Sequence, residues 1–189
     1  MIEIYQPQED SYLLSHVLKK ELKNKSKNKK INKNKDLKVL DIGSGSGIQT
    51  QTLISLGIAP ENITLTDINS DSIKPLKKNF KKSKIIKSNL FEKINKKEKF
   101  DVIVFNPPYL PEDKNEPKDS RISTTGGKKG SEIINKFLKQ SITHLKKHGI
   151  IFLLTSSLTK QINWQDWRKR VIAKKSLFFE ELFVWKVSI

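Results

Sequence analysis

The chain has 189 residues, a length typical of one domain that can bury a hydrophobic core without disulfides or structural metals. It has no cysteine, which excludes disulfides, cysteine-based zinc sites and cysteine nucleophiles, and no apolar run approaches the ~18 residues that a membrane span needs. The formal net charge is +17, from 34 lysines, 3 arginines and 20 acidic residues. This charge could serve contact with RNA or the ribosome. We favour drift in amino-acid composition as the source of the charge instead. Arginine binds phosphates better than lysine does, because it can donate two parallel hydrogen bonds, yet it is nearly absent.

The first predicted element is a helix at residues 11–22, where apolar residues recur at helical spacing behind an acidic start. The lysine- and asparagine-rich residues 23–36 have no periodicity and predict a solvated loop. Short apolar runs then alternate with helical patterns, and Pro75 is expected in the first turn of its helix. Predicted strands cover residues 37–43, 62–68, 84–88, 100–106 and 150–156, predicted helices cover residues 46–57, 71–82, 131–149 and 159–175, and residues 177–189 are expected to hold the last two strands.

This alternation predicts an α/β fold of the Rossmann-like type, with a mostly parallel seven-stranded sheet and helices on both faces. We expect a single domain over residues 1–189, in which an N-terminal helix and basic loop (1–36) precede the Rossmann-like core (37–189). Acidic residues interrupt the apolar N-terminus, so it does not predict a secretory signal, and we expect a soluble cytoplasmic protein. The histidines are expected on helices, with His16 and His144 on helix faces and His148 at a helix end.

The first candidate site is a glycine-rich turn after the first predicted strand. Glycine lets the backbone approach a ligand closely, and open α/β sheets bind ligands where their strands end. A carboxylate beside such a turn does not suit a pyrophosphate, but it suits a positively charged ligand group, such as the amino group of S-adenosylmethionine. The turn therefore predicts a cofactor site rather than a structural bend. Its pattern D-x-G-x-G-x-G comprises Asp41, Gly43, Gly45 and Gly47.

Two further strand ends extend the predicted cofactor site. Asp67 ends the second strand, where a carboxylate can accept hydrogen bonds from both ribose hydroxyls. The alternative role of helix N-cap fits Asn69 or Ser70 better. Asn89 follows the third strand and is predicted to bind the adenine amino group, with Leu90 as an apolar wall, although asparagine after a strand is also a common turn residue.

The second candidate site is the tetrapeptide N-P-P-Y at residues 106–109. Asn106 ends the fourth strand, which is expected beside the first, so its side chain would face the cofactor's methyl group. The following proline favours an extended Asn106, and the Asn106 amide oxygen and the Pro107 carbonyl would then accept both hydrogens of a planar NH2 group. Its nitrogen lone pair would point at the methyl carbon, and Tyr109 would pack on the flat group. Catalysis would come from orientation and charge stabilisation, without a general base before transfer.

The glycine turn, Asp67 and N-P-P-Y together resemble the class I S-adenosylmethionine-dependent methyltransferases that act on planar amino nitrogens. Two further stretches, YQPQEDSYLL at residues 5–14 and TGGKKGSEIINKFL at residues 125–138, resemble the HemK-type protein-glutamine methyltransferases, in particular their short archaeal and eukaryotic branch. The resemblance covers nearly all of residues 2–155. It implies methylation of the amide nitrogen of the glutamine in the Gly-Gly-Gln loop of a peptide-release factor, with a small zinc-binding activator subunit as partner.

The resemblance also implies roles for individual residues. Ser11 would contact the methionine end of the cofactor, and Gly126 and Gly127 would shape a loop near the active site. Two positions depart from the family pattern: Asn89 stands where the family usually has an acid, and Thr125 stands where an aromatic residue commonly precedes the two glycines. The first of these departures concerns the predicted adenine contact.

N-P-P-Y alone does not separate glutamine from adenine N6 or cytosine N4, because all three present the same planar NH2 group. The positive charge mildly favours a nucleic-acid substrate, whereas the absence of a target-recognition domain favours a protein. Lysine methylation is a further alternative. A non-catalytic RNA-binding subunit is the last one, although it has no need of the combined set Asp41, Asp67, Asn106 and Tyr109. The flank of the first strand and the edge formed by the second and third strands are candidate docking surfaces for a partner.

Overall fold

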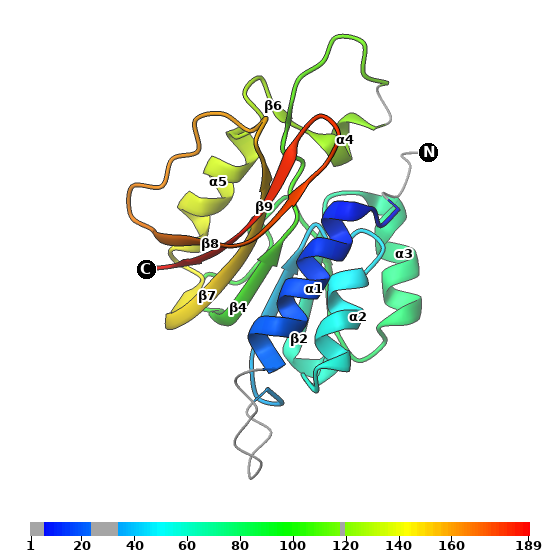
Figure 1. Ribbon diagram of the computed structural model, residues 1–189. Coiled ribbons are helices and arrows are strands. Elements are labelled where there is room, and N and C mark those ends of the chain that lie inside the picture. Colours follow the sequence, from blue (N-terminus) through cyan, green and yellow to red (C-terminus); the bar gives the residue numbers. More distant parts are fainter. Residues whose placement is uncertain (1–5, 24–33, 118–119) are drawn as a thin grey trace.

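The computed structural model describes residues 6–23, 34–117 and 120–189. Tyr5 of the N-terminal motif and most of the lysine-rich segment predicted as a loop lie outside the described residues. The described part is built around one twisted sheet, with α1, α2 and α3 on one face and α5 on the other (Figure 1). None of its helices is long and apolar enough to cross a membrane.

The main sheet has seven strands in the order β3-β2-β1-β4-β7-β9-β8, which confirms the predicted mostly parallel α/β architecture. Only β9 runs antiparallel to its neighbours β7 and β8. The strands are β1 (Val39–Ile42), β2 (Ile63–Asp67), β3 (Lys84–Lys87), β4 (Phe100–Phe105), β7 (Leu145–Ser156), β8 (Arg168–Ser176) and β9 (Glu181–Ser188), and a separate pair comprises β5 (Leu110–Pro111) and β6 (Thr125–Gly127). The helices are α1 (Glu9–Lys23), α2 (Ile48–Ser55), the 3-10 helix η2 (Pro60–Asn62), α3 (Ser70–Asn79), α4 (Arg121–Thr124) and α5 (Glu132–Ser141).

The central strands are buried on both faces, which is why β1 and β4 are mostly apolar rather than alternating, whereas β2 alternates apolar residues with buried threonines. β1 lies between β2 and β4, and Ile42 is in register with Phe105. The residues that follow β1 and β4 therefore emerge side by side at one edge of the sheet. This register brings the glycine turn and the N-P-P-Y segment together, as the sequence predicted.

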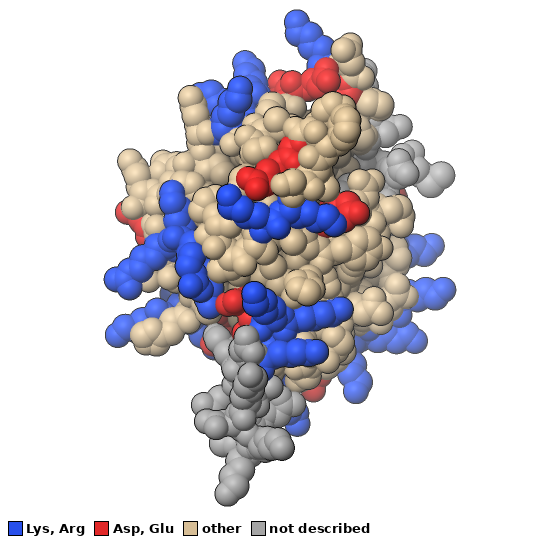
Figure 2. Space-filling view, in the orientation of Figure 1, with Lys and Arg blue, Asp and Glu red and all other residues tan. Residues whose placement is uncertain are grey.

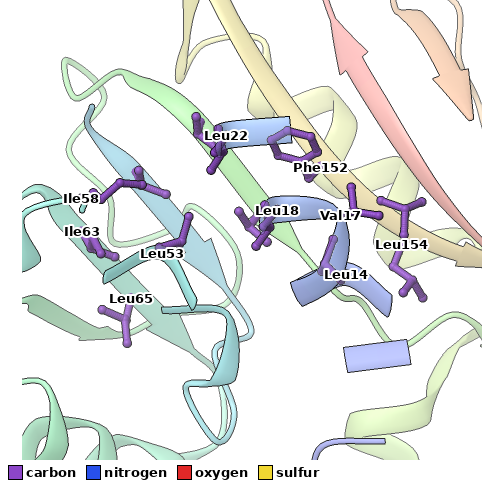
Figure 3. Packing of buried hydrophobic residues seen from close by; sticks show 14 of the residues in the cluster. Leu14, Val17, Leu18, Leu22, Leu53, Ile58, Ile63, Leu65, Phe152 and Leu154 are labelled. Carbon is purple, nitrogen blue, oxygen red and sulfur yellow. The ribbon is translucent and has the colours of Figure 1, made fainter. Parts of the chain in front are cut away.

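Two hydrophobic clusters hold the helices on the sheet. On one face, α1 presents an apolar stripe that packs against β7, while α2 and the residues after it cover β2 (Figure 3). On the other face, α5 buries its own stripe against β4 and β7. Fully burying one such side chain contributes about 1.5–3 kcal/mol. The stripe of α1 comprises Leu14, Val17, Leu18 and Leu22, and that of α5 comprises Ile134, Phe137 and Leu138.

The predicted helix at residues 131–149 is too long. α5 ends at Ser141, and β7 already begins at Leu145, which pairs with Phe100. Pairing along β4 overrides the local helical pattern. His148 is consequently an exposed strand residue rather than a helix-end cation. His144 is not on a helix face either, because it is buried in the connection, where its Nδ1 lies 2.9 Å from the Glu98 carbonyl oxygen.

The predicted helix at residues 159–175 is wrong. Residues 159–167 contain no helix, and β8 follows as an edge strand. Its antiparallel pairing with β9, interrupted by a register shift between Val171 and Ala173, determines its conformation. Residues 177–189 accordingly hold one of the last two strands, not both. Pro75 is also misplaced by the prediction, because it lies inside α3 beyond the first turn, and Asn69 is the N-cap that accepts a hydrogen bond from the Asp71 backbone N–H.

Candidate active site

A cavity of about 300 Å³ opens at the carboxyl ends of β1, β2, β3 and β4, beside the start of α1. This volume lies at the lower end of the ~300–1,000 Å³ usual for small-molecule sites. Most residues predicted for the site line it, whereas Asp41, Gly47 and Tyr109 do not. The predicted residues in the lining are Ser11, Gly43, Gly45, Asp67, Asn89, Leu90, Asn106 and Pro107.

The ionisable side chains of the cavity are all acidic. Asp10 and Asp67 line it, and no lysine, arginine or histidine does among the described residues. The chain as a whole has 37 lysines and arginines against 20 acids, so this lining departs sharply from the average surface. An acidic pocket in a basic protein suits a ligand that carries positive charge.

The glycine-rich turn after β1 is held against β2 by backbone hydrogen bonds. The Ser44 N–H donates to the Thr66 carbonyl over 3.0 Å. Gly47 cannot be replaced without strain, because its φ is +83° and a Cβ there would lie 2.4 Å from the Phe80 ring. The fold therefore fixes this turn with its backbone facing the cavity.

Asp67 ties the turn to the end of β2. One carboxylate oxygen accepts the Gly45 N–H at 2.8 Å, and the other accepts the Asn69 N–H, also at 2.8 Å. Burial raises the pKa of Asp67, and these backbone hydrogen bonds offset only part of the rise. Each carboxylate oxygen has lone-pair capacity beyond its one backbone bond, so the group can accept further hydrogen bonds from a ligand.

Asp41 lies behind the turn rather than in the cavity wall. Only 1% of it is exposed, and one of its oxygens accepts the Thr50 hydroxyl at 2.6 Å. Burial raises the pKa of Asp41 to about 7, and the nearby charge of Asp67 raises it further against the lowering effect of the Thr50 hydrogen bonds. Asp41 is therefore a buried residue beneath the turn, and not the wall residue of the cavity that the sequence predicted for a carboxylate beside the ligand.

The segment after β3 forms another side of the cavity. Asn89 donates its side-chain N–H to Glu92 Oε1 over 2.9 Å, which leaves its own amide oxygen as the acceptor available to a ligand. Leu90 has a φ of +51°, an unusual conformation for a residue with a side chain, and the Ser88 hydroxyl donates to its carbonyl over 3.0 Å. The geometry is compatible with the predicted polar contact and apolar wall.

Asn106 stands at the end of β4 with its amide orientation set. Its Nδ2 donates to Asp10 Oδ2 over 2.8 Å. Its Oδ1 is buried and has no hydrogen-bond partner among the described residues. A buried amide oxygen without a partner costs free energy unless a ligand supplies the missing donor. This oxygen and the carbonyl of the adjacent Pro107 are the two acceptors that the sequence predicted.

Asp10 and Gln49 stand out among the cavity residues that were not predicted from the sequence as site residues. Asp10 appeared only as part of the acidic start of the first helix, yet it holds Asn106. Gln49, in the first turn of α2, donates its Nε2 to the Ser11 carbonyl over 2.9 Å, and its buried Oε1 has no partner among the described residues. No sequence signal distinguishes Gln49 beyond its place just after the glycine turn.

The Gly126–Gly127 segment supports N-P-P-Y from behind through the β5–β6 pair, in which Leu110 pairs with Thr125. A Cβ on Gly126 would lie 2.6 Å from the Pro108 carbonyl oxygen, so only glycine allows this approach. Tyr109 packs against both hydrophobic clusters, and its carbonyl accepts the Thr159 hydroxyl at 2.9 Å. The tyrosine thus anchors the segment in the core.

Comparison with known proteins gives a consistent result. The family model described as "Methyltransferase small domain" matches residues 15–164. A Methanocaldococcus jannaschii protein named "Putative protein N5-glutamine methyltransferase MJ0928" is 38% identical over 197 residues, which cover 96% of this chain and 90% of that protein. A release factor glutamine methyltransferase from Aquifex aeolicus is 33% identical over 137 residues, covering 64% of this chain but 47% of the relative.

Two solved structures share the fold. The E. cuniculi Mtq2-Trm112 complex, described as responsible for the methylation of the translation termination factor eRF1, superposes with a TM-score of 0.70 at 24% identity, covering 97% of this chain and 96% of that one. The T. thermophilus 16S rRNA methyltransferase RsmC, in complex with AdoMet and guanosine, gives a TM-score of 0.63 at 19% identity, covering 96% of this chain and 43% of that one. The chain belongs to the methyltransferase small domain family, and its predicted resemblance to the protein-glutamine methyltransferases is confirmed.

Proposed function

We propose that the chain transfers a methyl group from S-adenosylmethionine to the side-chain amide nitrogen of the glutamine in the Gly-Gly-Gln motif of a peptide-release factor. The observation that carries this proposal is the unpartnered, buried Oδ1 of Asn106, oriented by Asp10 at the wall of an acidic cavity. The names of the M. jannaschii and A. aeolicus relatives support the choice of glutamine.

The residues of the cavity fit S-adenosylmethionine, which carries a cationic sulfonium and an ammonium group. When bound, the cofactor supplies an electrophilic methyl group. Asp67 would accept hydrogen bonds from the ribose hydroxyls, and the free oxygen of Asn89 would accept one from the adenine amino group. The unpartnered Oε1 of Gln49, next to Ser11, would accept a hydrogen bond from the ammonium group.

Asn106 and Pro107 would hold the substrate amide. Their two oxygens accept both hydrogens of the NH2 group and hold its plane in one orientation. An amide nitrogen is a weak nucleophile because its lone pair is delocalised. These residues can therefore accelerate the transfer mainly by positioning the amide and by stabilising the developing charge. The two oxygens also stabilise the positive charge that develops on the nitrogen.

The charge distribution favours a protein substrate over a nucleic acid. The phosphate backbone is bound mainly by lysine and arginine, and none of the described residues that line the cavity is basic. A basic groove does exist, but it lies at the opposite edge of the sheet, where β7 and β8 begin and β9 ends. Figure 2 shows lysine and arginine side chains on the left side of the molecule, where Figure 1 places the start of β7 and the C-terminus. The groove is lined by Lys147, His148, Arg168, Lys169, Arg170 and Lys186.

The basic groove is where we expect any contact with RNA. Two of the three arginines of the chain lie there, although lysine dominates everywhere else. Replacing Arg168 and Arg170 by glutamine should reduce the slope of log affinity against log salt for single-stranded RNA by about 1.4, or ~0.7 per phosphate contact. The matched control replaces Lys81 and Lys82, both exposed, by glutamine. Equal slopes for both variants would contradict a specific role of the groove.

A small zinc-binding activator subunit is the partner we propose, and the free edge of β3 is its expected docking surface. β3 ends the sheet, with Lys84 and Lys87 exposed and the two isoleucines between them half-buried. An open edge strand of this kind can pair with a strand of another chain. The Mtq2-Trm112 complex shows that a neighbour of the same fold works with a partner. Replacing Ile85 by proline should abolish co-purification with the subunit, and retained co-purification would exclude this edge.

The direct test combines the purified chain and its partner subunit with labelled S-adenosylmethionine and the release factor of the same organism. We expect label in the wild-type factor and none in a factor whose Gly-Gly-Gln glutamine is replaced by alanine. Asn106→Ala should abolish turnover and leave the cofactor dissociation constant within about threefold, because Asn106 faces the acceptor. Equal labelling of both factors, or labelling of DNA or lysine instead, would overturn the proposal.

A further inference from the structure

The exposed hydrophobic side chains of the described residues are concentrated at the edge of the sheet where the cavity opens. Eight large hydrophobic residues are exposed, and six of them lie at this edge. Ile68 and Ile122 line the cavity itself, whereas the other four lie outside its lining. The six are Tyr12, Ile68, Ile122, Leu158, Phe178 and Phe179, and the two at other places are Ile142 and Ile189.

The most exposed of these residues form the tip of the hairpin between β8 and β9. Phe178 is 93% exposed and Phe179 is 85% exposed, and their rings touch edge to face with centroids 4.8 Å apart. The Leu177 N–H donates to the Glu180 carbonyl over 2.8 Å and closes the turn. Two adjacent phenylalanines exposed to water on a closed turn lower the solubility of a protein. Exposed apolar patches of this kind mark interaction sites.

The hairpin is connected to the start of α1, which lines part of the cavity. Its base is fixed to the end of β7, where the Ser157 N–H donates to the Glu181 carbonyl over 2.8 Å. Lys175 forms an ion pair with Glu9 at the start of α1, and the next residue of the helix, Asp10, holds Asn106. Figure 1 shows the hairpin tip at the same end of the molecule as the start of α1.

We infer that Phe178 and Phe179 form a docking knob for the release factor. The knob contacts the surface of the release factor outside its Gly-Gly-Gln loop. The inference rests on the proposed function. A folded substrate must approach this edge of the sheet to place one glutamine beside Asn106, so its body covers the surroundings of the cavity. The knob fits a shallow apolar depression on that substrate, and Tyr12 and Leu158 extend the same contact.

The position of the knob argues against other occupants. A bound cofactor would cover Ile68 and Ile122 inside the cavity, but it would not reach the hairpin tip, which is absent from the cavity lining. The open edge of β3 lies at the far side of the sheet from β8, so a subunit that pairs with β3 leaves the hairpin uncovered. The macromolecular substrate is the occupant that needs both the cavity and its rim.

The test compares full-length release factor with a short synthetic peptide that contains the Gly-Gly-Gln loop. The double variant Phe178→Ser/Phe179→Ser should raise KM for the full-length factor about tenfold or more, as expected for two interface aromatics, with kcat within twofold. Kinetics on the peptide should be unchanged. The dissociation constant of the full-length factor, measured with S-adenosylhomocysteine in place of the cofactor, should rise by the same factor as KM.

The matched control is Ile189→Ser, which removes an exposed hydrophobic residue (50% exposed) at the opposite edge and should change neither constant. Equal losses on peptide and full-length factor, or unchanged KM and Kd on the factor, would overturn the inference. A double variant that loses self-association or the activator subunit without a change in KM would assign the knob to another chain, and would also overturn it. Should wild-type protein methylate neither substrate, the proposed function fails, and the Kd comparison still decides the docking question.

Discussion

The hydrogen bond from Asn106 to Asp10 gives the sharpest test of the catalytic geometry. Asp10 is 4% exposed, and its Oδ2 receives the Asn106 Nδ2 over 2.8 Å. This contact decides which end of the amide points at the substrate. With the amide turned around, Oδ1 would face the carboxylate and the NH2 group would face the substrate's own hydrogens. Asp10 is therefore a positioning residue for Asn106.

The expected magnitude follows from the charge on Asp10. A hydrogen bond to a charged group contributes about 1.5–3 kcal/mol, which corresponds to roughly 10- to 150-fold in rate if it is lost from the arrangement that reacts. Asp10→Ala should lower kcat by an amount in this range. Asp10→Asn keeps a neutral acceptor of the same shape, so its loss of kcat should lie near the lower end of this range.

The assay measures kcat on the Gly-Gly-Gln peptide and the cofactor dissociation constant separately. The cofactor constant should change by a smaller factor than kcat, since Asp10 bonds Asn106 directly and acts on the cofactor only through its charge in the cavity lining. Glu9→Gln is the matched control, because Glu9 is the neighbouring carboxylate and is largely exposed, and its kcat should stay within twofold. Unchanged kcat in Asp10→Ala, or a tenfold loss of cofactor affinity with kcat intact, would refute the positioning role.

Three further predictions concern the walls of the cavity. Asp67→Ala should weaken cofactor binding at least about tenfold with kcat at saturation nearly unchanged, and an unchanged dissociation constant in titration calorimetry would refute the ribose contact. Gly126→Ala should displace the Pro108 carbonyl, lowering kcat about tenfold or more and the melting temperature by several degrees, while cofactor affinity persists; wild-type kcat would contradict this. Asp41 has a pKa raised from 3.8 to about 7, so the folded state holds a proton that the unfolded state has lost between these values. Its contribution to stability is therefore fully present below about pH 4 and decreases as pH rises to about 7, by at most about 4 kcal/mol. In urea unfolding, the stability of wild type relative to Asp41→Asn should fall across this window, and a constant difference would exclude the raised pKa.

Much of the fold was predictable because its centre is buried on both faces. Strands such as β1 and β4 are then continuous apolar runs, and parallel strands with helical crossovers leave few possible arrangements. The C-terminal part was not predictable in the same way. Residues 159–175 have charges and apolar residues at mixed spacing, and only the pairing of β8 with β9 makes Arg168–Ser176 a strand. The α5–β7 boundary failed for the same reason, since pairing with β4 reaches back to Leu145.

The candidate site shows a similar division. Residues at strand ends were found because the topology brings the carboxyl ends of parallel strands together. Asp10 and Gln49 were missed because their importance comes from contacts between elements far apart in sequence, from α1 to β4 and from α2 to α1. Tyr109 matched a motif, but its side chain is used by the core rather than by the cavity wall.

The first residues of α1, which belong to the N-terminal motif, make long-range contacts that the sequence alone did not reveal. Its residues Glu9, Asp10 and Ser11 looked like an acidic helix start with an implied cofactor contact, yet each makes a different long-range contact. Glu9 pairs with Lys175 and holds the β8–β9 hairpin, Asp10 orients Asn106, and the Ser11 carbonyl receives Gln49. The first turn of α1 therefore contacts three separate parts of the chain: the β8–β9 hairpin, the segment after β4, and α2. The contacts of Glu9 and Asp10 use side chains, and successive helix positions point about 100° apart, so these two contacts depend on the order of the residues. The Ser11 contact uses a backbone carbonyl that any residue supplies. Exchanging Asp10 and Ser11 should keep the helix and lower kcat at least as much as Asp10→Ala does, and wild-type kcat would show that capping is the whole role of the motif.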